Sequence, residues 1–278
     1  MAPAGTRLGS VRTILTVKEN SWIKRIGNEL LDLVYPPGLY CICCGKIIDD
    51  TRTYRLCNDC MKAMNWNTGR HCSKCGRPLA DTDPGELCFG CAREETAGHE
   101  HFFDRGHACT SYGACAQSVI FALKYGGRAD IGDTLGEMLS DYMLSEYEAD
   151  ELAGMYDIVI PVPIHIEKLK RRGFNHAELI SRGFVKRTGL RSDPGALIRT
   201  RETQPMKGLG PEERRANISG AFAIRNSRLP RIEGARILLI DDIFTTGSTI
   251  DEIAKLLKSS GAETVDFLTF AAAGDMII

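Results

Sequence analysis

Residues 237–250 read ILLIDDIFTTGSTI. Four apolar residues run directly into Asp241 and Asp242, and a segment rich in Thr, Gly and Ser follows. The apolar run predicts a buried strand over residues 236–241, and the pattern after the polar segment predicts a helix over residues 248–259. In an open parallel sheet, ligands bind outside the carboxyl ends of the strands. The two carboxylates are therefore expected at a ligand-binding edge.

Four interpretations of this stretch compete. A nucleotide-binding Walker B strand would require the motif GxxxxGK[ST] upstream, but the only Gly-Lys pair, Gly45-Lys46, lies between cysteines. An acidic pocket of the receiver type would place the acid pair on the first strand, not the second-last. A polar strand end with Ser248 or Thr249 as helix cap accounts for one or two hydroxyl groups only. The fourth interpretation is a site for a phosphorylated sugar.

The sugar-phosphate interpretation explains the whole segment. Two adjacent carboxylates can each accept a hydrogen bond from one of two vicinal ribose hydroxyls. At a helix N-terminus, backbone N–H groups and hydroxyls converge on a phosphate, and Gly247 allows the backbone to approach closely. The candidate phosphoribosyl-binding residues are Asp241, Asp242, Thr245, Thr246, Gly247, Ser248 and Thr249.

The cysteines form an internal repeat. CICCGKIIDDTRTYRLCNDC (41–60) and CSKCGRPLADTDPGELCFGC (72–91) align without gaps. Each copy has two CxxC pairs, and a glycine follows the second cysteine, where a metal-binding turn favours left-handed backbone. We predict two structural zinc ions rather than disulfides or an iron–sulfur cluster. Their ligands are Cys41, Cys44, Cys57 and Cys60 in one copy and Cys72, Cys75, Cys88 and Cys91 in the other.

The repeat leaves some candidate ligands unused. Cys44 rather than Cys43 is the ligand, because Cys44 aligns with Cys75 and precedes the glycine. Cys43, Cys109 and Cys115 are then expected to be ordinary buried or idle thiols. His99, His101 and His107 are expected to be solvated rather than to form another metal site.

Composition excludes several classes of protein. The 278 residues carry a formal net charge of −1, so any nucleic-acid surface must be a local patch. No apolar stretch approaches the roughly 18 residues that a membrane span needs. The first 18 residues lack an apolar segment and a cleavage site, which predicts a frayed tail and a cytoplasmic protein. Residues 22–35 predict an amphipathic helix.

The pattern after residue 98 alternates between apolar runs and amphipathic stretches. Strands separated by helices predict an α/β fold with a parallel sheet covered on both faces. Strands are expected at 107–112, 156–163, 196–200, 220–224 and 264–273, and helices at 115–124, 131–147 and 175–188.

The stretch that begins at Ile237 resembles the 5-phosphoribosyl-1-pyrophosphate (PRPP) motif of type I phosphoribosyltransferases. Further segments and the cysteine repeat resemble the ComF family of competence-associated proteins: FALKYGGRADIG (121–132), DIVIPVPIHIEKLKRRGFNHAELI (157–180) and RETQPMKGLGPEERRANISGAF (201–222). The resemblance implies a tail and short helix (1–36), a double zinc ribbon (37–95) and a phosphoribosyltransferase-like domain (98–278). One departure is that the family's Gln near the position of Met206 occurs here as Gln204.

The resemblance also implies roles for residues outside the motif. Pro161, Val162, Pro163 and Ile164 correspond to the loop that meets pyrophosphate, and residues 201–217 to a mobile segment over the sugar. Mg²⁺ would bridge pyrophosphate and ribose oxygens. Basic residues that would contact the anion, or would merely form a solvated surface, are Lys168, Arg171, Arg172, Arg201 and Arg214.

Two functions follow from the resemblance. One is binding of PRPP with Mg²⁺ and phosphoribosyl transfer to an unknown acceptor, linked to competence and DNA uptake. The other is a non-catalytic adaptor that binds single-stranded DNA or a DNA-uptake helicase and keeps the phosphoribosyl site as a sensor or relic.

Overall fold

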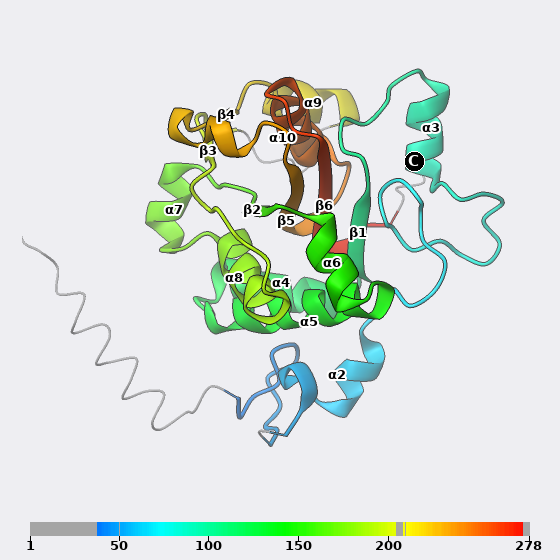
Figure 1. Cartoon of the computed structure of the whole chain (residues 1–278). Helices are drawn as coiled ribbons and strands as arrows, with labels where there is room; N and C mark the ends of the chain where they lie inside the picture. Colours follow the sequence, from blue (N-terminus) through cyan, green and yellow to red (C-terminus); the bar gives the residue numbers. More distant parts are fainter. Residues whose placement is uncertain (1–37, 50, 204–207, 209, 275–278) are drawn as a thin grey trace, which may run out of the picture.

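The computed structural model describes residues 38–274, apart from residues 50, 204–207 and 209. Its centre is a four-stranded parallel sheet (Figure 1). The strand order is β1 (Gly106–Ser111), β6 (Thr264–Ala272), β5 (Arg236–Phe244) and β2 (Ile158–Pro161). The parallel pairing and near-continuous burial of these strands confirm the predicted α/β fold. The predicted helix at 22–35 lies outside the described residues.

Two helical layers cover the sheet. Along β5, Ile237 and Leu239 pack in the core on the side of α10 (Ser248–Ser259), whereas Leu238 and Ile240 pack on the other side. This alternation follows from the pleat of a strand. In Figure 1, α9 and α10 lie above the sheet, and the other layer lies below. That lower layer consists of α4 (Ala114–Tyr125), α5 (Asp130–Glu146) and α8 (His176–Thr188).

The remaining elements lie around the sheet. Strands were expected near 196–200 and 220–224, and β3 (Leu197–Arg199) and β4 (Phe222–Ile224) occur there. They pair with each other, antiparallel, outside the main sheet. Helices that the apolar pattern did not predict are α6 (Ala149–Met155), α7 (Ile166–Arg172) and α9 (Pro211–Ile218), and η2 (Asn226–Arg231) is a 3₁₀ helix. Among the described residues, no helix is both long and apolar enough to cross a membrane.

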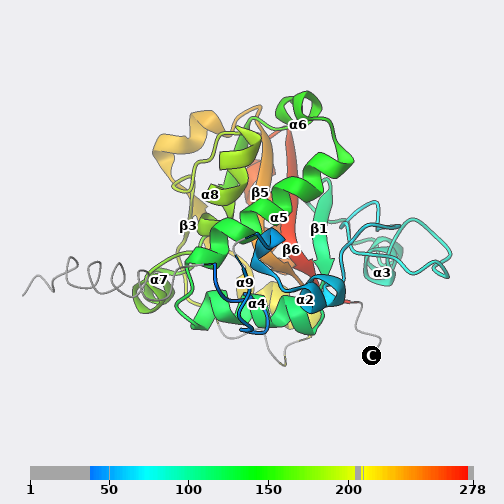
Figure 2. The ribbon, with the colours of Figure 1, turned by 90° about the horizontal axis from the view of Figure 1, so that it is seen from below.

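The two cysteine repeats pack against different parts of the sheet domain. The first cysteine repeat (41–60), with η1 (Thr53–Arg55) and α2 (Asn58–Ala63), lies against α5 (Figure 2). There the Tyr54 hydroxyl donates to Asp141 at 2.7 Å. The second cysteine repeat (72–91), whose last three residues begin α3 (Phe89–Thr96), lies beside β1, where the Gly106 N–H donates to the Lys74 carbonyl at 2.8 Å.

Helices α5 and α8 approach each other closely because glycines face each other at their crossing. A Cβ atom built on Gly136 would lie 2.5 Å from the Phe184 backbone nitrogen, and one on Gly183 would lie 2.7 Å from the Asp133 carbonyl oxygen. Neither distance leaves room for a side chain. The crossing positions both helices under the sheet.

Replacing Gly136 by Val is therefore expected to destabilise the fold by about 3 kcal/mol or more, because the added atoms meet backbone that cannot move aside. Gly154, in α6, is the matched control: nothing lies within 4 Å of its Cβ position. Gly154→Ala should be neutral or stabilise by about 0.5–1 kcal/mol. Urea unfolding followed by circular dichroism measures both. Equal stabilities for the two variants would contradict the packing described.

Candidate functional site

Asp241 and Asp242 lie within the last four residues of β5, which continues to Phe244 rather than ending at residue 241 as expected. The pleat directs their side chains to opposite faces of the sheet. Along the chain, both aspartates come after Ile240, which pairs with Pro161, the last residue of the neighbouring strand β2. The acid pair is therefore at the carboxyl edge of the sheet, as the sequence predicted.

Asp242 is buried beneath helices α4 and α8. Only 2% of the residue is exposed. The Lys124 ammonium of α4 contacts Asp242 Oδ2, and His176 Nε2 of α8 lies 3.3 Å from Asp242 Oδ1. Burial alone would raise the pKa of Asp242, but Lys124 and His176 outweigh it and hold that pKa below its ordinary value. Asp242 is thus ionised and already paired by residues of the protein.

Asp241 has a different environment. It is partly exposed, and its Oδ1 accepts a hydrogen bond from the Asp242 N–H at 2.9 Å. Burial raises the pKa of Asp241 well above its ordinary value, and the charge of Asp242 raises it further. A cation or a hydroxyl donor at this carboxylate would relieve that penalty. Of the two acids, Asp241 is therefore the one available to a ligand.

The polar segment after β5 forms a tight turn at the start of α10. Gly247 has φ +78°, a left-handed conformation that favours glycine, and Ser248 is the first residue of the helix. The Thr246 and Ser248 hydroxyls lie 3.1 Å apart. Asp241, the 245–249 turn and Arg214 of α9 line one cavity. The structure thus brings together a carboxylate, hydroxyls, a helix N-terminus and an arginine.

The segment expected to meet pyrophosphate, residues 161–164, begins at the last residue of β2. Its Val162 N–H donates to the Ile240 carbonyl at 2.9 Å, one residue before Asp241. Asn175 fixes the segment from the other side by donating to the Val162 carbonyl at 3.0 Å. Pro161, Val162 and Pro163 are buried and Ile164 is half-buried.

Positive charge gathers beside this segment. Lys168 of α7 is half-buried, and burial together with the charges of Arg199 and Arg172 lowers its pKa. Burial also lowers the pKa of Arg199. The backbone of Arg199 forms an isolated parallel β-bridge with that of His165, which comes four residues after the end of β2. A cation whose pKa is lowered by neighbouring cations favours a bound anion. Arg171, in contrast, is exposed.

Two predicted anion contacts in the 201–217 segment differ in position. Arg214 lines the cavity with Asp241. Arg201 instead donates to the carbonyls of Asn217 and Ser219 at 3.0 and 2.9 Å and so connects the two ends of the segment. The position of Gln204 and Met206, where the family resemblance is imperfect, lies outside the described residues.

Sequence reasoning assigned no role to Lys124 or His176. The signal was present: His176 shares an apolar helix face with Ile180 and Phe184, and Lys124 follows Ile120 by one helical turn. A single titratable residue on an apolar stripe indicates a buried partner. Nothing local identified that partner as Asp242.

Both cysteine tetrads fit a tetrahedral metal ion. Within each predicted tetrad, the four sulfur atoms lie within 4.8 Å of one another. Sulfurs about 2.3 Å from a central zinc ion are ~3.8 Å apart. The Cys44–Cys57 and Cys75–Cys88 sulfurs are separated by 3.7 and 3.6 Å. All four positions are cysteines, so the sites are closed, structural zinc sites.

The prediction that all three histidines are solvated needs correction, whereas the prediction for the remaining cysteines does not. Cys43, Cys109 and Cys115 are free thiols, as expected; Cys109 is buried, and the half-buried Cys43 and Cys115 have their sulfurs 3.0 Å apart. His107 is buried in β1, and burial lowers its pKa to about 3. His101 is paired rather than solvated, since its Nδ1 lies 2.6 Å from the Asp251 carboxylate. His99 is exposed, as expected.

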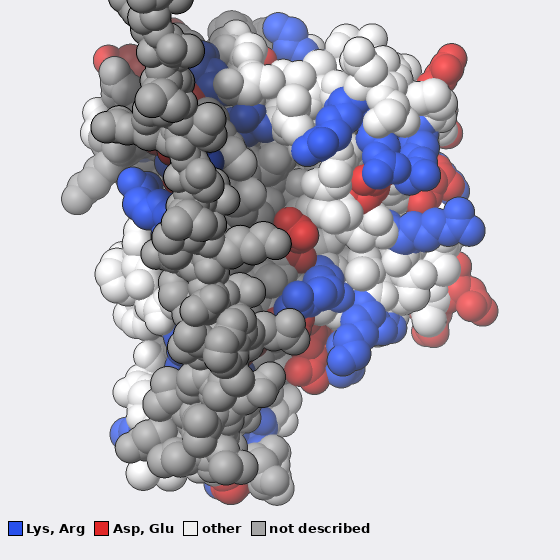
Figure 3. Space-filling model, turned by 90° about the vertical axis from the view of Figure 1, so that its left-hand side faces the viewer, with Lys and Arg blue, Asp and Glu red and all other residues white. Residues whose placement is uncertain are grey.

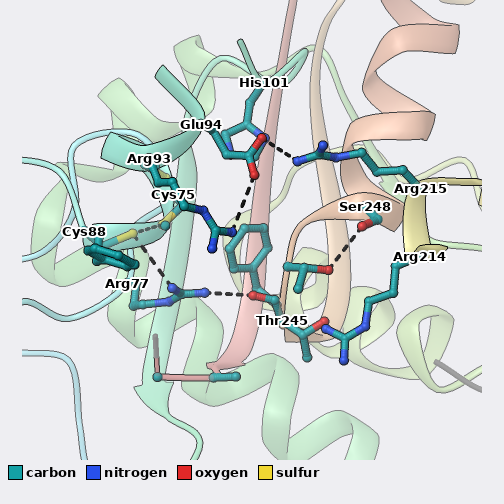
Figure 4. Close-up of a pocket in the computed structure, with 17 residues that line it drawn as sticks. Cys75, Arg77, Cys88, Arg93, Glu94, His101, Arg214, Arg215, Thr245 and Ser248 are labelled. Atoms are coloured by element: carbon teal, nitrogen blue, oxygen red, sulfur yellow. Dashed lines mark hydrogen bonds and ion pairs between the residues drawn. The ribbon is translucent and has the colours of Figure 1, made fainter. Parts of the chain in front are cut away.

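The two tetrads differ in burial. The cysteines of the second cysteine repeat are all buried, whereas Cys44 is exposed and Cys57 half-buried in the first. A cavity separates the second cysteine repeat from the 245–249 turn, and Arg77 reaches across to the Thr245 carbonyl (Figure 4).

We expect elemental analysis to find two zinc ions per chain. A chelator should remove the ion of the first cysteine repeat at least tenfold faster, because Cys44 is open to solvent. Cys44→Ser should abolish the fast phase and Cys75→Ser the slow one, as followed by a zinc-sensitive dye. Release of both ions in one phase, or a content far below two, would contradict the assignment.

Comparisons with known proteins agree with this geometry. The model of a double zinc ribbon domain matches residues 30–92, and that of a phosphoribosyl transferase domain matches residues 169–276. DNA utilization protein YhgH of Escherichia coli O6:H1 is 34% identical over 53% of this chain and 63% of its own length. Competence protein F of Haemophilus influenzae is 33% identical over 42% of this chain and 51% of its own.

Competence protein ComFC of Streptococcus pneumoniae is 30% identical over 47% of this chain and 55% of its own length. Each of these alignments thus spans less than two thirds of the relative. The chain combines a double zinc ribbon domain with a phosphoribosyl transferase domain, as the resemblance to the ComF family implied, and it is a homologue of competence protein F.

Proposed function

We propose that the chain binds PRPP with Mg²⁺ at the carboxyl ends of β5 and β2 and transfers its phosphoribosyl group to an acceptor. The observation that carries this proposal is the shared cavity of Asp241, the 245–249 turn and Arg214, together with the half-buried cations Lys168 and Arg199. One ligand with a sugar between two phosphate groups complements that arrangement.

Each part of the ligand has a counterpart. The 5-phosphate fits the turn, where hydroxyls and backbone N–H groups precede a twelve-residue helix. The ribose hydroxyls fit Asp241, since Asp242 is held by Lys124 and His176. Pyrophosphate fits the segment 161–164, with Lys168 and Arg199 to balance its charge.

The oxygen ligands suit Mg²⁺. Asp241, Asp242 and His176 each place one ligand atom within 4.8 Å of the others. Because Asp242 is engaged by Lys124, Asp241 would hold the ion together with oxygens of the substrate. When bound, Mg²⁺ would supply positive charge against the pyrophosphate oxygens.

The residues of the chain would then position the substrate and exclude water from it. In the transfer, the bond from the anomeric carbon to pyrophosphate breaks and a bond to the acceptor's nucleophilic atom forms. Lys168 and Arg199 would stabilise charge that develops on the leaving pyrophosphate. Residues 201–217 would cover the sugar and limit attack by water.

A second candidate function is an adaptor that binds single-stranded DNA or a helicase during DNA uptake in the cytoplasm. It is favoured by the names of the relatives, which refer to competence and DNA utilization. On the face shown in Figure 3, however, Lys and Arg side chains are interspersed with Asp and Glu. Such mixing supports weak, salt-sensitive contact with a nucleic acid.

Calorimetric titration with Mg²⁺ and PRPP tests the leading proposal. The zinc-loaded protein should show saturable binding, and Asp241→Asn should weaken it at least tenfold by removing the ligand-facing charge. Asp157→Asn is the matched control, because Asp157 pairs with Arg236 at the opposite end of β5. Absence of binding by the unmodified protein would contradict the proposal.

Lys124→Met should destabilise the fold by roughly 3–5 kcal/mol, because Asp242 would lose the cation that compensates its buried charge. Thermal unfolding measures this loss. Lys170→Met is the control, since Lys170 is exposed and pairs only with Glu167 of its own helix in the described structure. Equal unfolding temperatures for the two variants would show that the Asp242 carboxylate does not depend on Lys124.

For the adaptor, fluorescence anisotropy with labelled single-stranded DNA should detect affinity at low salt that declines as salt is raised. Absence of affinity at low salt would remove DNA as the adaptor's ligand.

A further inference from the structure

We propose that Arg77 of the second cysteine repeat is a positioning residue for the 245–249 turn, so that the metal site of this repeat supports the phosphate end of the ligand site. This inference rests on the proposed function for what the turn binds. The contact itself does not depend on it.

Arg77 joins the tetrad to the turn directly. Its Nη2 donates to the Thr245 carbonyl at 2.7 Å, and its Nη1 lies 3.8 Å from Cys88 Sγ (Figure 4). The guanidinium also lies over the Phe244 ring, 5.7 Å from its centre. Only 7% of Arg77 is exposed. Its side chain therefore has little freedom once these three contacts are made.

Holding the Thr245 carbonyl also orients the next N–H group. A trans peptide is planar, so the carbonyl of Thr245 and the N–H of Thr246 point in opposite directions. Because Arg77 fixes the carbonyl toward the second cysteine repeat, the N–H of Thr246 points away from it. Gly247, whose φ is positive, then lets the chain turn into α10. Arg77 thus sets the orientation of the first peptide group in the turn.

The buried charge of Arg77 lies beside the tetrad, with Nη1 3.8 Å from Cys88 Sγ. A buried guanidinium is costly unless an anion lies beside it. Four thiolates around one Zn²⁺ carry a net charge of about −2, and bound metal keeps the thiols deprotonated. The Cys88 sulfur is thereby an anionic partner for Arg77 as long as the site is occupied.

Two further contacts connect the same region to the helices around the turn. Arg215 of α9 pairs with Glu94 of α3, which begins directly after Cys88. His101 pairs with Asp251 in the first turn of α10. The second cysteine repeat and the chain that follows it thus contact the turn, α10 and α9.

The first cysteine repeat provides an internal comparison. Its residue aligned with Arg77 is Lys46, whose side chain is 65% exposed and pairs with Asp59 of the same repeat at 2.8 Å. The aligned positions therefore share a positive charge but not a role. Lys46 is the matched control for Arg77.

The test compares Arg77→Ala, Arg77→Lys and Lys46→Ala in the full-length, zinc-loaded chain. Hydrogen exchange of peptides covering residues 245–249 should become roughly tenfold faster in Arg77→Ala. The slow exchange should be partly restored in Arg77→Lys, which keeps the charge but lacks the paired N–H donors of the guanidinium. In Lys46→Ala the exchange rate should be unchanged. Unchanged exchange in Arg77→Ala would overturn the inference.

Ligand binding gives a second readout. Arg77→Ala should weaken the affinity for ribose 5-phosphate about tenfold and leave the affinity for inorganic pyrophosphate unchanged, because only the 245–249 turn is disturbed. Equal losses for both would indicate general destabilisation and overturn the inference. If the unmodified protein binds neither probe, the proposed function fails, while hydrogen exchange still decides whether Arg77 positions the turn. If Arg77→Ala loses zinc, the neutral donor Arg77→Gln is measured by the same two readouts.

Discussion

The buried carboxylate of Asp242 is the constraint on which the arrangement of this domain depends. A charge with 2% exposure is stable only if other groups compensate it. Lys124 and His176 do so from α4 and α8, two helices separated by fifty residues of chain. The pairing fixes both helices against the end of β5. It therefore places the carboxyl edge of the sheet at the ends of these helices.

The pleat of β5 gives two adjacent aspartates separate roles. Asp242 faces the lower helical layer, where Lys124 and His176 hold it, and its neighbour Asp241 faces the opposite side, next to the 245–249 turn. The electrostatic cost at Asp241, raised by burial and by Asp242, remains for a ligand or cation to relieve. Structural stability and the proposed affinity for a ligand thus involve consecutive residues of one strand.

The local parts of the structure could be predicted from the sequence. Helix 248–259 was predicted with its observed bounds, and the two tetrads follow from spacing alone. What could not be predicted depends on distant pairing. The contact of Arg77 with Thr245 joins residues 168 positions apart, and no local pattern reports it. The 197–199 and 222–224 strands carry strand-like residues, but nothing local shows that they pair outside the sheet. Helices α7 and α9 are too highly charged to show an apolar stripe.

Two repeats of similar sequence have diverged in their surroundings. In one, the tetrad is partly exposed and the position aligned with Arg77 carries a solvated lysine; in the other, the tetrad is buried and Arg77 reaches the ligand edge. Two metal sites of similar sequence thus differ in their burial and in their contacts with the rest of the chain.

The most direct test of the account is to map the amide chemical shifts of the zinc-loaded protein as Mg²⁺ and PRPP are added. Saturable shifts at Asp241 and residues 245–249, together with those at 161–164, are the predicted result. Absence of shifts at both segments, or shifts confined to the cysteine repeats, would contradict a phosphoribosyl site at the end of β5.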